Sequence, residues 1–204
     1  MDQIVYVVDD DEAVRRSLVR LLESAAYTVA DFASAEAFLA HTFSPVPSCL
    51  ILDMNMPVAN GFDVAETLHN NGHAIPIIFL TGFGTIPMSV KAMKAGAHEF
   101  LTKPVMADQL LNAVADALQL AEKNLTLSCE HLALRQRHQT LTPRECEVLE
   151  LAIGGLLNKQ IANALGVSEI TAKVHKRRVM EKMQARSLAD LVRAAERLNI
   201  LKSQ

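Results

Sequence analysis

Residues 49–57 read Cys-Leu-Ile-Leu-Asp-Met-Asn-Met-Pro, and the rest of the chain is arranged around this stretch. Its run of apolar residues between Pro47 and Pro57 favours a short strand that is buried on both faces. Such a strand delivers Asp53 to a loop at its carboxyl end, where open α/β sheets bind ligands. Taken alone, an aspartate at a strand end is more often a helix cap than a reactive group, so other residues are needed to distinguish the two.

Five strand-like runs alternate with helical patterns over about the first 120 residues. The runs are residues 3–8, 27–32, 49–53, 76–80 and 98–101, and the helical patterns are residues 12–25, 34–41, 61–70, 87–96 and 106 onward. This alternation predicts a parallel sheet with helices on both faces, joined by right-handed crossovers. The flavodoxin-like strand order 2-1-3-4-5 fits best, and it makes the first and third strands neighbours.

The second half of the chain has a different charge and a different pattern. Residues 1–120 hold 6 Lys and Arg against 14 Asp and Glu, a net charge of −8, whereas residues 121–204 hold 14 against 9, a net charge of +5. Two domains with different partners are indicated, and the basic one favours a polyanion. From charge alone, two solvated surfaces would be the better interpretation.

Several classes of protein are excluded by composition. No run of 18 apolar residues is present, so no membrane span is expected, and the first residues lack the pattern of a signal peptide. Cys49, Cys129 and Cys146 have no metal-ligand spacing, which indicates reduced thiols in the cytoplasm.

Residues 105–139 contain no strand signal and predict one long helix. Its apolar stripe is Val114, Leu118, Ala121, Leu125 and Leu132. The stripe suits a helix that leaves the first domain, and a seam between two chains is the alternative.

Thr142-Pro143-Arg144-Glu145 opens a further unit with the signature of a capping box. Four helices are expected, at about 143–153, 158–165, 169–183 and 187–198. The second and third, joined by a tight turn at Gly166, suit a helix-turn-helix. The predicted architecture is therefore a flavodoxin-like α/β domain (1–120), a helical linker (121–140) and an all-α four-helix helix-turn-helix domain (141–204).

The carboxyl ends of the predicted strands gather a set of residues suited to phosphate chemistry. Asp9, Asp10 and Asp53 offer the hard oxygen ligands that Mg²⁺ prefers, and Asp53 could attack a phosphoryl donor. Lys103 and the metal would neutralise the phosphoryl oxygens, while Thr81 would donate a hydroxyl hydrogen bond. Taken alone, Lys103 is more simply a surface lysine and Thr81 a residue that caps a strand end. Their occurrence together with the three aspartates favours the site.

The first 120 residues resemble the receiver domain of two-component systems. The resemblance is carried by Val7-Val8-Asp9-Asp10-Asp11, Asp53-x-x-Met56-Pro57, Thr81-Gly82 and Lys103-Pro104. It implies that Asp53 is phosphorylated and that Mg²⁺ is bound by Asp10, Asp53 and the main-chain carbonyl of Asn55, with Asp9 acting mainly through water.

The same resemblance assigns the phosphoryl contacts to Thr81 and Lys103, makes the Lys103–Pro104 bond cis and places Phe100 at the switch aromatic. This chain departs from the usual pattern in three ways. Phe100 has no hydroxyl, so a hydrogen-bond readout by that group is excluded. Gly82 replaces a common Ala or Ser, and Val105 replaces a frequent Phe.

Residues 141–202 resemble the four-helix DNA-binding domain of the LuxR/NarL type. The motifs are Leu-Thr-x-Arg-Glu at 141–145, Asn158-Lys159-x-Ile161-Ala162, Leu165-x-Val167-Ser168 and Thr171-x-Lys173-Val174-His175. The resemblance implies that the second helix of the motif enters the major groove.

By the same resemblance, three residues face base edges and four hold phosphates. The base-facing residues are Lys173, Val174 and Arg177; the phosphate contacts are Asn158, Lys159, Thr171 and Arg178. His175 shares a face with Ala172 and Val179, so half-buried packing competes with DNA contact. The alternative for the whole helix is a solvated surface with local ion pairs such as Glu169–Lys173 and Arg177–Glu181.

Together the two resemblances describe a FixJ/NarL-type response regulator. They imply a DNA-binding transcription regulator, phosphorylated on Asp53 by a sensor histidine kinase, that binds a double-stranded operator and forms a homodimer when phosphorylated. RNA polymerase is a candidate partner. The dimer contact is expected on helix 87–96 and the last strand, with apolar material from Ile86, Met88, Val90 and Val105.

Two other functions remain open at this point. A Mg²⁺-dependent phosphatase would use Asp53 as nucleophile, but it needs an acid–base aspartate two residues later, where Asn55 stands. A receiver whose basic tail serves only protein contacts is the other. No enzymatic activity is expected beyond the receiver's own phosphoryl transfer and dephosphorylation.

Overall fold

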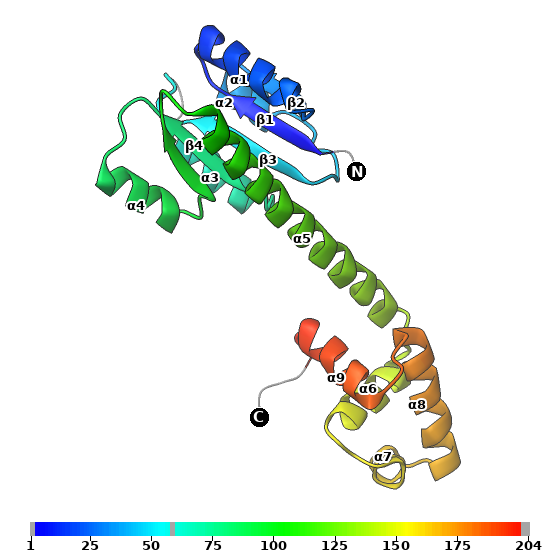
Figure 1. Cartoon of the computed structure of the whole chain (residues 1–204). Helices are drawn as coiled ribbons and strands as arrows, with labels where there is room; N and C mark the ends of the chain where they lie inside the picture. Colours follow the sequence, from blue (N-terminus) through cyan, green and yellow to red (C-terminus); the bar gives the residue numbers. More distant parts are fainter. Residues whose placement is uncertain (1–2, 58–59, 201–204) are drawn as a thin grey trace. The chain divides into compact units, whose positions relative to one another are not determined.

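The structure is a computed structural model that describes residues 3–57 and 60–200 (Figure 1). It divides into two compact units, Met1–Thr126 and Leu127–Gln204. Their boundary falls inside one helix and within the stretch predicted to be a linker. No helix of the described residues is long and apolar enough to cross a membrane.

The first unit is built on a parallel sheet with the predicted strand order, β2-β1-β3-β4-β5. The strands are β1 (Ile4–Val8), β2 (Thr28–Phe32), β3 (Ser48–Asp53), β4 (Ile77–Thr81) and β5 (Glu99–Thr102). Every residue of β3, the central strand, is buried. Val8 lies opposite Leu52, and Asp53 lies opposite Leu80. The residues that follow β1 and β3 therefore emerge side by side at one edge of the sheet.

Helices cover both faces of this sheet because the strand residues alternate between two cores. Val5 and Val7 pack with helices α1 and α5, whereas Tyr6 and Val8 pack with α2, α3 and α4. The helices are α1 (Glu12–Ser24), α2 (Ala35–Leu39), α3 (Gly61–Asn70), α4 (Ile86–Lys94) and α5 (Ala107–Gln139). The flavodoxin-like fold predicted from the sequence is confirmed.

The apolar stripe that begins at Val114 lies on helix α5, and only its first part is covered. Val114 and Leu118 are buried in the core of the first unit, against the sheet. Leu132, in contrast, is 58% exposed. Leu118 is therefore not available for a seam between two chains, because its own sheet already covers it.

The residues predicted to supply the dimer contact differ in exposure on helix α4 and after β5. Ile86, Val90 and Met93 are exposed, but Met88, like Phe100, packs against the core that contains Ala92. Met88 lies one helical turn before the fully buried Ala92, so both point inward while Ile86, Val90 and Met93 point outward. Val105 is likewise partly buried, against the core that contains Leu110.

As far as residue 200, where the described part of the chain ends, the second unit consists of four helices and the end of α5. The helices are α6 (Pro143–Ile153), α7 (Asn158–Leu165), α8 (Glu169–Met183) and α9 (Leu188–Arg197). Thr142 and Glu145 form the predicted capping box of α6. Gly166 ends α7 with a φ of 64°, a left-handed conformation that favours glycine. The core of this unit also includes Leu134 of α5.

Candidate functional site

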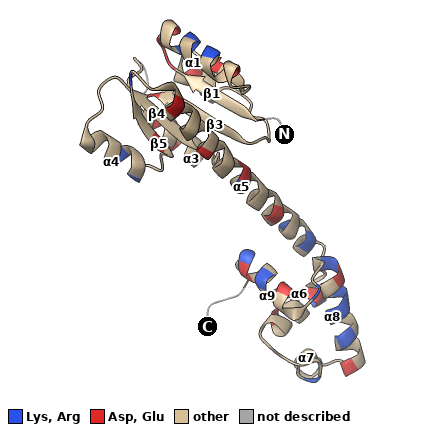
Figure 2. Cartoon of the chain, viewed as in Figure 1, with Lys and Arg blue, Asp and Glu red and all other residues tan. Residues whose placement is uncertain are grey.

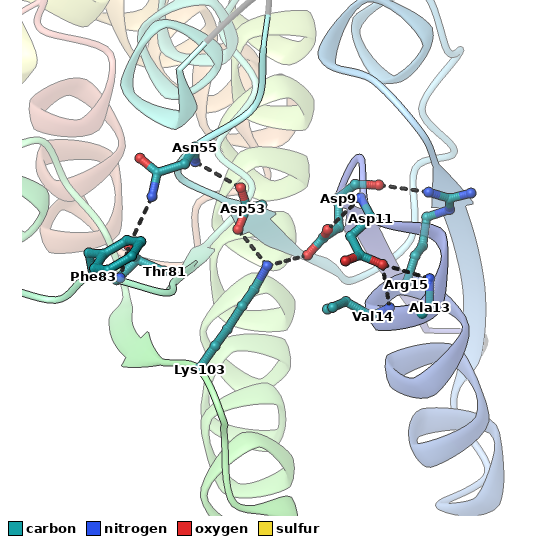
Figure 3. A network of polar contacts seen from close by, with 10 residues as sticks. All are labelled: Asp9, Asp11, Ala13, Val14, Arg15, Asp53, Asn55, Thr81, Phe83 and Lys103. Carbon is teal, nitrogen blue, oxygen red and sulfur yellow. Dashed lines mark hydrogen bonds and ion pairs between the residues drawn. The ribbon is translucent and has the colours of Figure 1, made fainter.

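Two buried carboxylates share one lysine at the carboxyl edge of β1 and β3 (Figure 3). Lys103 Nζ lies 2.6 Å from Asp9 Oδ2 and 2.6 Å from Asp53 Oδ1. Asp9 is 1% exposed and Asp53 is 5% exposed. Two carboxylates this close would repel each other without a cation, so the ammonium of Lys103 stabilises the pair.

The pKa values of Asp9 and Lys103 are shifted by burial and by hydrogen bonds within this cluster. Burial raises the pKa of Asp9, while the hydrogen bond from Lys103 opposes that rise. Burial by itself would lower the pKa of Lys103, but the hydrogen bonds to Asp53 and Asp9 outweigh it and the pKa is raised. Lys103 therefore stays protonated at neutral pH and holds a fixed positive charge beside Asp53.

Main-chain and side-chain donors fix the remaining atoms around Asp53. Asn55 N donates to Asp53 Oδ2 at 2.8 Å, and Asn55 Nδ2 donates to Thr81 Oγ1 at 3.4 Å. Phe83 N also donates to Thr81 Oγ1, at 3.2 Å. Thr81 is fully buried. Asp53, Asn55 and Thr81 thus form one connected network (Figure 3).

The structure does not place every predicted residue in this network. Asp10 is exposed at the end of β1. Asp11 is the N-cap of α1 and accepts from Ala13 N and Val14 N. Phe100 is partly buried against the core of the α2–α4 face. The Lys103–Pro104 peptide bond is cis, as the resemblance implied.

The loop that follows β4 contains a glycine, Gly84, packed against β5. A Cβ at Gly84 would collide with the Thr102 methyl group and touch the Phe100 ring. Gly82, which the sequence analysis singled out, has open space around its Cα. Gly84 is therefore the loop glycine that the packing requires.

The donor set at this edge is chemically suited to Mg²⁺. Asp9 and Asp53 already share one cation, and Mg²⁺ in proteins commonly uses one or two carboxylates while keeping several waters. Residues 3–57 and 60–200 contain no group of three or more His, Cys, Asp and Glu side chains poised to hold a metal. Carboxylates, carbonyl groups and water would together have to complete such a site.

Arg15 supports the acid pair, and the sequence analysis missed it. Its Nη1 donates to the main-chain oxygen of Asp9 at 2.8 Å, and its Nε donates to Asp31 Oδ2 at 2.9 Å. The hydrogen bond to Asp9 fixes the peptide plane between Asp9 and Asp10, and so the direction that the chain takes at Asp10. Arg15 lies on α1 and Asp31 lies on β2, and no local signal in the sequence links the two.

Lysine and arginine residues follow one another along helix α8 of the second unit (Figure 2). The exposed members of the predicted DNA-contact set are Lys159, Lys173, Val174, Arg177 and Arg178; Asn158 and Thr171 are half-buried. Arg177 Nε lies 2.7 Å from Glu181 Oε1, so the expected local ion pair is present.

His175 lies between the core and the surface of α8. Its exposure is intermediate, and the neighbouring Ala172 and Val179 are buried. Its Nδ1 atom is buried without a hydrogen-bond partner among the described residues, as is Oδ1 of Asn158. His175 is therefore half-buried, which is one of the two alternatives that the sequence left open.

A buried ion pair ties α8 to the start of α6. Lys182 Nζ lies 2.6 Å from Glu145 Oε2 and donates to Thr140 O at 2.9 Å. The hydrogen bonds from Lys182 and the backbone of Thr142 lower the pKa of Glu145 to about 2. Glu145 is predictable from the sequence as part of a cap but not as the partner of Lys182, which stands 37 residues later.

We expect Glu145→Gln to destabilise the second unit by about 2 kcal/mol at neutral pH, because it removes a charged hydrogen-bond acceptor. The folded pKa lies below the ordinary value of 4.5, so this stabilisation is complete above about pH 4.5 and is lost as the pH falls toward 2. Calorimetric unfolding of the full chain should therefore give a difference between wild type and variant that shrinks below pH 4.5.

The matched control is Glu147→Gln, because Glu147 pairs with Arg144 at the exposed surface of the same helix. This variant should change stability by less than about 1 kcal/mol. A difference between wild type and Glu145→Gln that stays constant from pH 6 to 2 would contradict the assignment.

Comparison with known proteins extends the resemblance over nearly the whole chain. Residues 5–115 match the response regulator receiver domain, and residues 139–195 match the bacterial regulatory proteins of the luxR family. Nodulation protein W of Bradyrhizobium diazoefficiens is 46% identical over 197 residues, which cover 97% of this chain and 87% of that protein.

Two further relatives also align over nearly the whole of this chain. The transcriptional regulatory protein FixJ of Bradyrhizobium diazoefficiens is 39% identical over 197 residues, which cover 97% of this chain and 96% of FixJ. The solved structure of the response regulator StyR shares 46% sequence identity with a TM-score of 0.85, covering 96% of this chain and 99% of StyR.

Both domain matches agree with the two units of the structure, and the relatives align over both. The parallel sheet accounts for the receiver match, and the four-helix unit accounts for the luxR match. The chain therefore belongs to the FixJ/NarL family of response regulators, transcription regulators of two-component systems that join a receiver to a LuxR-type DNA-binding domain.

Proposed function

We propose that this protein is a transcription factor switched by phosphorylation of Asp53 by a partner sensor histidine kinase. The observation that carries the proposal is the contact of Lys103 with both Asp9 and Asp53 at 2.6 Å, at the edge of a receiver sheet. In the same chain, a LuxR-type unit exposes Lys173, Arg177 and Arg178 on α8, which suits a double-stranded DNA operator.

The chemistry follows from the arrangement around Asp53. A carboxylate oxygen of Asp53 attacks the phosphorus of a phosphohistidine; the N–P bond breaks, the electron pair returns to the imidazole, and an acyl phosphate forms. Lys103 neutralises the phosphoryl oxygens. Asp10, Asp53 and the main-chain carbonyl of Asn55, with Asp9 acting through water, would hold Mg²⁺, which would supply further positive charge beside those oxygens.

The switch begins at Thr81. Its hydroxyl, which now accepts from Asn55 and Phe83, turns to donate to the phosphoryl group on Asp53. Phe100 then fills the space that Thr81 leaves, because the two residues lie on the paired strands β4 and β5. The altered surface of α4 and β5 pairs with the same surface of a second copy.

The exposed side chains of α4 support this pairing. Ile86 is 81% exposed, and Val90 and Met93 are about half exposed on the same side of the helix. A symmetric receiver dimer would present two recognition helices to the half-sites of a roughly palindromic operator.

Sedimentation tests the pairing. With beryllofluoride, a mimic of the phosphoryl group, the wild type should shift from monomer to dimer, and Val90→Lys should remain monomeric because it places like charges across the two-fold axis. Leu132→Lys, on the exposed part of α5, should still form the dimer. Equal dimerisation with and without beryllofluoride, or its loss only in Leu132→Lys, would contradict the proposal.

The two alternatives have less support. A phosphatase would need an acid–base carboxylate two residues after Asp53, but the side chain of Asn55 donates to Thr81 instead. A purely protein-binding tail would leave the LuxR-type match without a role. We therefore propose no enzymatic role beyond the receiver's own phosphoryl transfer and dephosphorylation, a site of action on DNA in the cytoplasm, and RNA polymerase as a further partner.

A further inference from the structure

Helix α8 exposes an apolar residue that the motif comparison did not use. Ile170, the second residue of the helix, is 77% exposed, more than any other large apolar side chain described in the second unit. Val174 follows one turn later and is 44% exposed. The two side chains lie one helical turn apart and form a small apolar patch on α8, which a partner could bury favourably.

The position of Ile170 on the helix is fixed by the buried residues. An α-helix turns by roughly 100° per residue, which places Ile170 about 180° from Val179. Val179 is fully buried, and Ala172 and Met183 are buried beside it. Ile170 therefore lies at the centre of the face that points away from its own domain.

Charges on the same face identify the partner. Lys173 and Arg177 stand three and seven residues after Ile170, so all three share one side of the helix. Two cations beside an exposed aliphatic group suit a polyanion rather than an apolar protein groove. Glu181, paired with Arg177, marks the other end of this face. The contact therefore falls on the N-terminal half of α8.

We propose that Ile170, with Val174 beside it, recognises the 5-methyl group of a thymine in the major groove. The inference rests on the proposed DNA-binding function and adds the chemistry of the base that is read. Recognition helices contact base edges with their N-terminal residues, and the thymine methyl is the apolar group on those edges. Each half-site of the operator must then hold a thymine within reach of Ile170.

Deoxyuridine provides the test, because it differs from thymidine only by this methyl. A duplex is first selected from a random library with the full chain, acetyl phosphate and Mg²⁺, and each thymine is then replaced singly by deoxyuridine. Wild type should lose about fourfold in affinity at one position of each half-site, as expected for one buried methyl. Ile170→Ala should bind the selected duplex and the duplex with deoxyuridine at that position equally.

Two controls separate this role from general binding. Leu157→Ala removes an apolar side chain that is 71% exposed at the start of α7, and it should keep the wild-type preference for thymine. Lys159→Ala should weaken every duplex alike and lower the salt dependence by about one counterion. Circular dichroism of Ile170→Ala should be unchanged, because the residue lies outside the core.

The outcomes distinguish the inference from the function on which it rests. If wild type binds the selected duplex with normal salt dependence but ignores every deoxyuridine replacement, the inference is wrong and the proposed function stands. Retained discrimination in Ile170→Ala also overturns the inference, because another residue then reads the methyl. Failure of wild type to bind any duplex at any salt concentration overturns both.

Discussion

Replacement of Asp53 by asparagine should abolish phosphorylation of the chain by acetyl phosphate and Mg²⁺. The amide cannot attack phosphorus, whereas the side-chain volume and the hydrogen bond from Asn55 N to the side-chain oxygen are retained. Lys103 keeps its contact with Asp9, so the receiver should remain folded. Intact-mass measurement should show one added phosphoryl group on wild type and none on Asp53→Asn.

An exposed aspartate on the neighbouring helix provides the control. Asp63→Asn changes the same functional group outside the Lys103 network and should be labelled like wild type. Equal labelling of wild type and Asp53→Asn would show that another residue accepts the phosphoryl group, and the assignment of the site would be wrong.

Replacement of Lys103 by alanine should lower the stability of the receiver and slow its phosphorylation, and Mg²⁺ should offset only the loss of stability. Without the ammonium, the buried carboxylates of Asp9 and Asp53 repel each other, and the receiver should lose about 3 kcal/mol of stability. Mg²⁺ should restore much of this loss, because the variant no longer has a cation that competes for both carboxylates. The rate of phosphorylation should still fall by about 10²–10³-fold, since a charge that stabilises the phosphoryl oxygens is gone.

Thermal unfolding with and without Mg²⁺ measures the first effect, and the rate of labelling by acetyl phosphate measures the second. Lys91→Ala is the matched control, because Lys91 lies over the Phe62 ring and outside the acid network. Equal stabilisation of wild type and Lys103→Ala by Mg²⁺, or an unchanged labelling rate, would be incompatible with the role given to Lys103.

Most of the fold could be predicted because local signals agree along the chain. The strands appear as short apolar runs, and helix starts coincide with side chains that cap them, such as Ser34, Thr142 and Ser187. The strand order followed from the alternation of strands and helices, and it brought Asp9 and Asp53 to one edge before any contact was known.

Contacts between distant, ordinary-looking side chains could not be predicted in the same way. Arg15 and Asp31 stand on a helix and a strand, and nothing in either local pattern names the other as partner. The pair of Glu145 and Lys182 is similar, because Glu145 already had a role as a cap. Such contacts depend on the angles between packed elements, which periodicity does not specify.

Periodicity also leaves the partner of an apolar face undetermined. The stripe through Val114 and Leu118 suits a seam between two chains as well as a helix on its own sheet, and the structure shows the latter. On α4, Met88 belongs to the inner face with Ala92, whereas Ile86 and Val90 lie outside. Distinguishing the two faces requires knowledge of which side the sheet covers.

The most direct test of a phosphorylation switch is the affinity of the full chain for a selected duplex, measured by fluorescence anisotropy at fixed salt with and without acetyl phosphate and Mg²⁺. Asp53→Asn provides the comparison under identical conditions. We predict that phosphorylation tightens binding by wild type by about tenfold or more, within the usual range of allosteric coupling, and leaves Asp53→Asn unchanged. Equal affinity of phosphorylated and unphosphorylated wild type would contradict the switch.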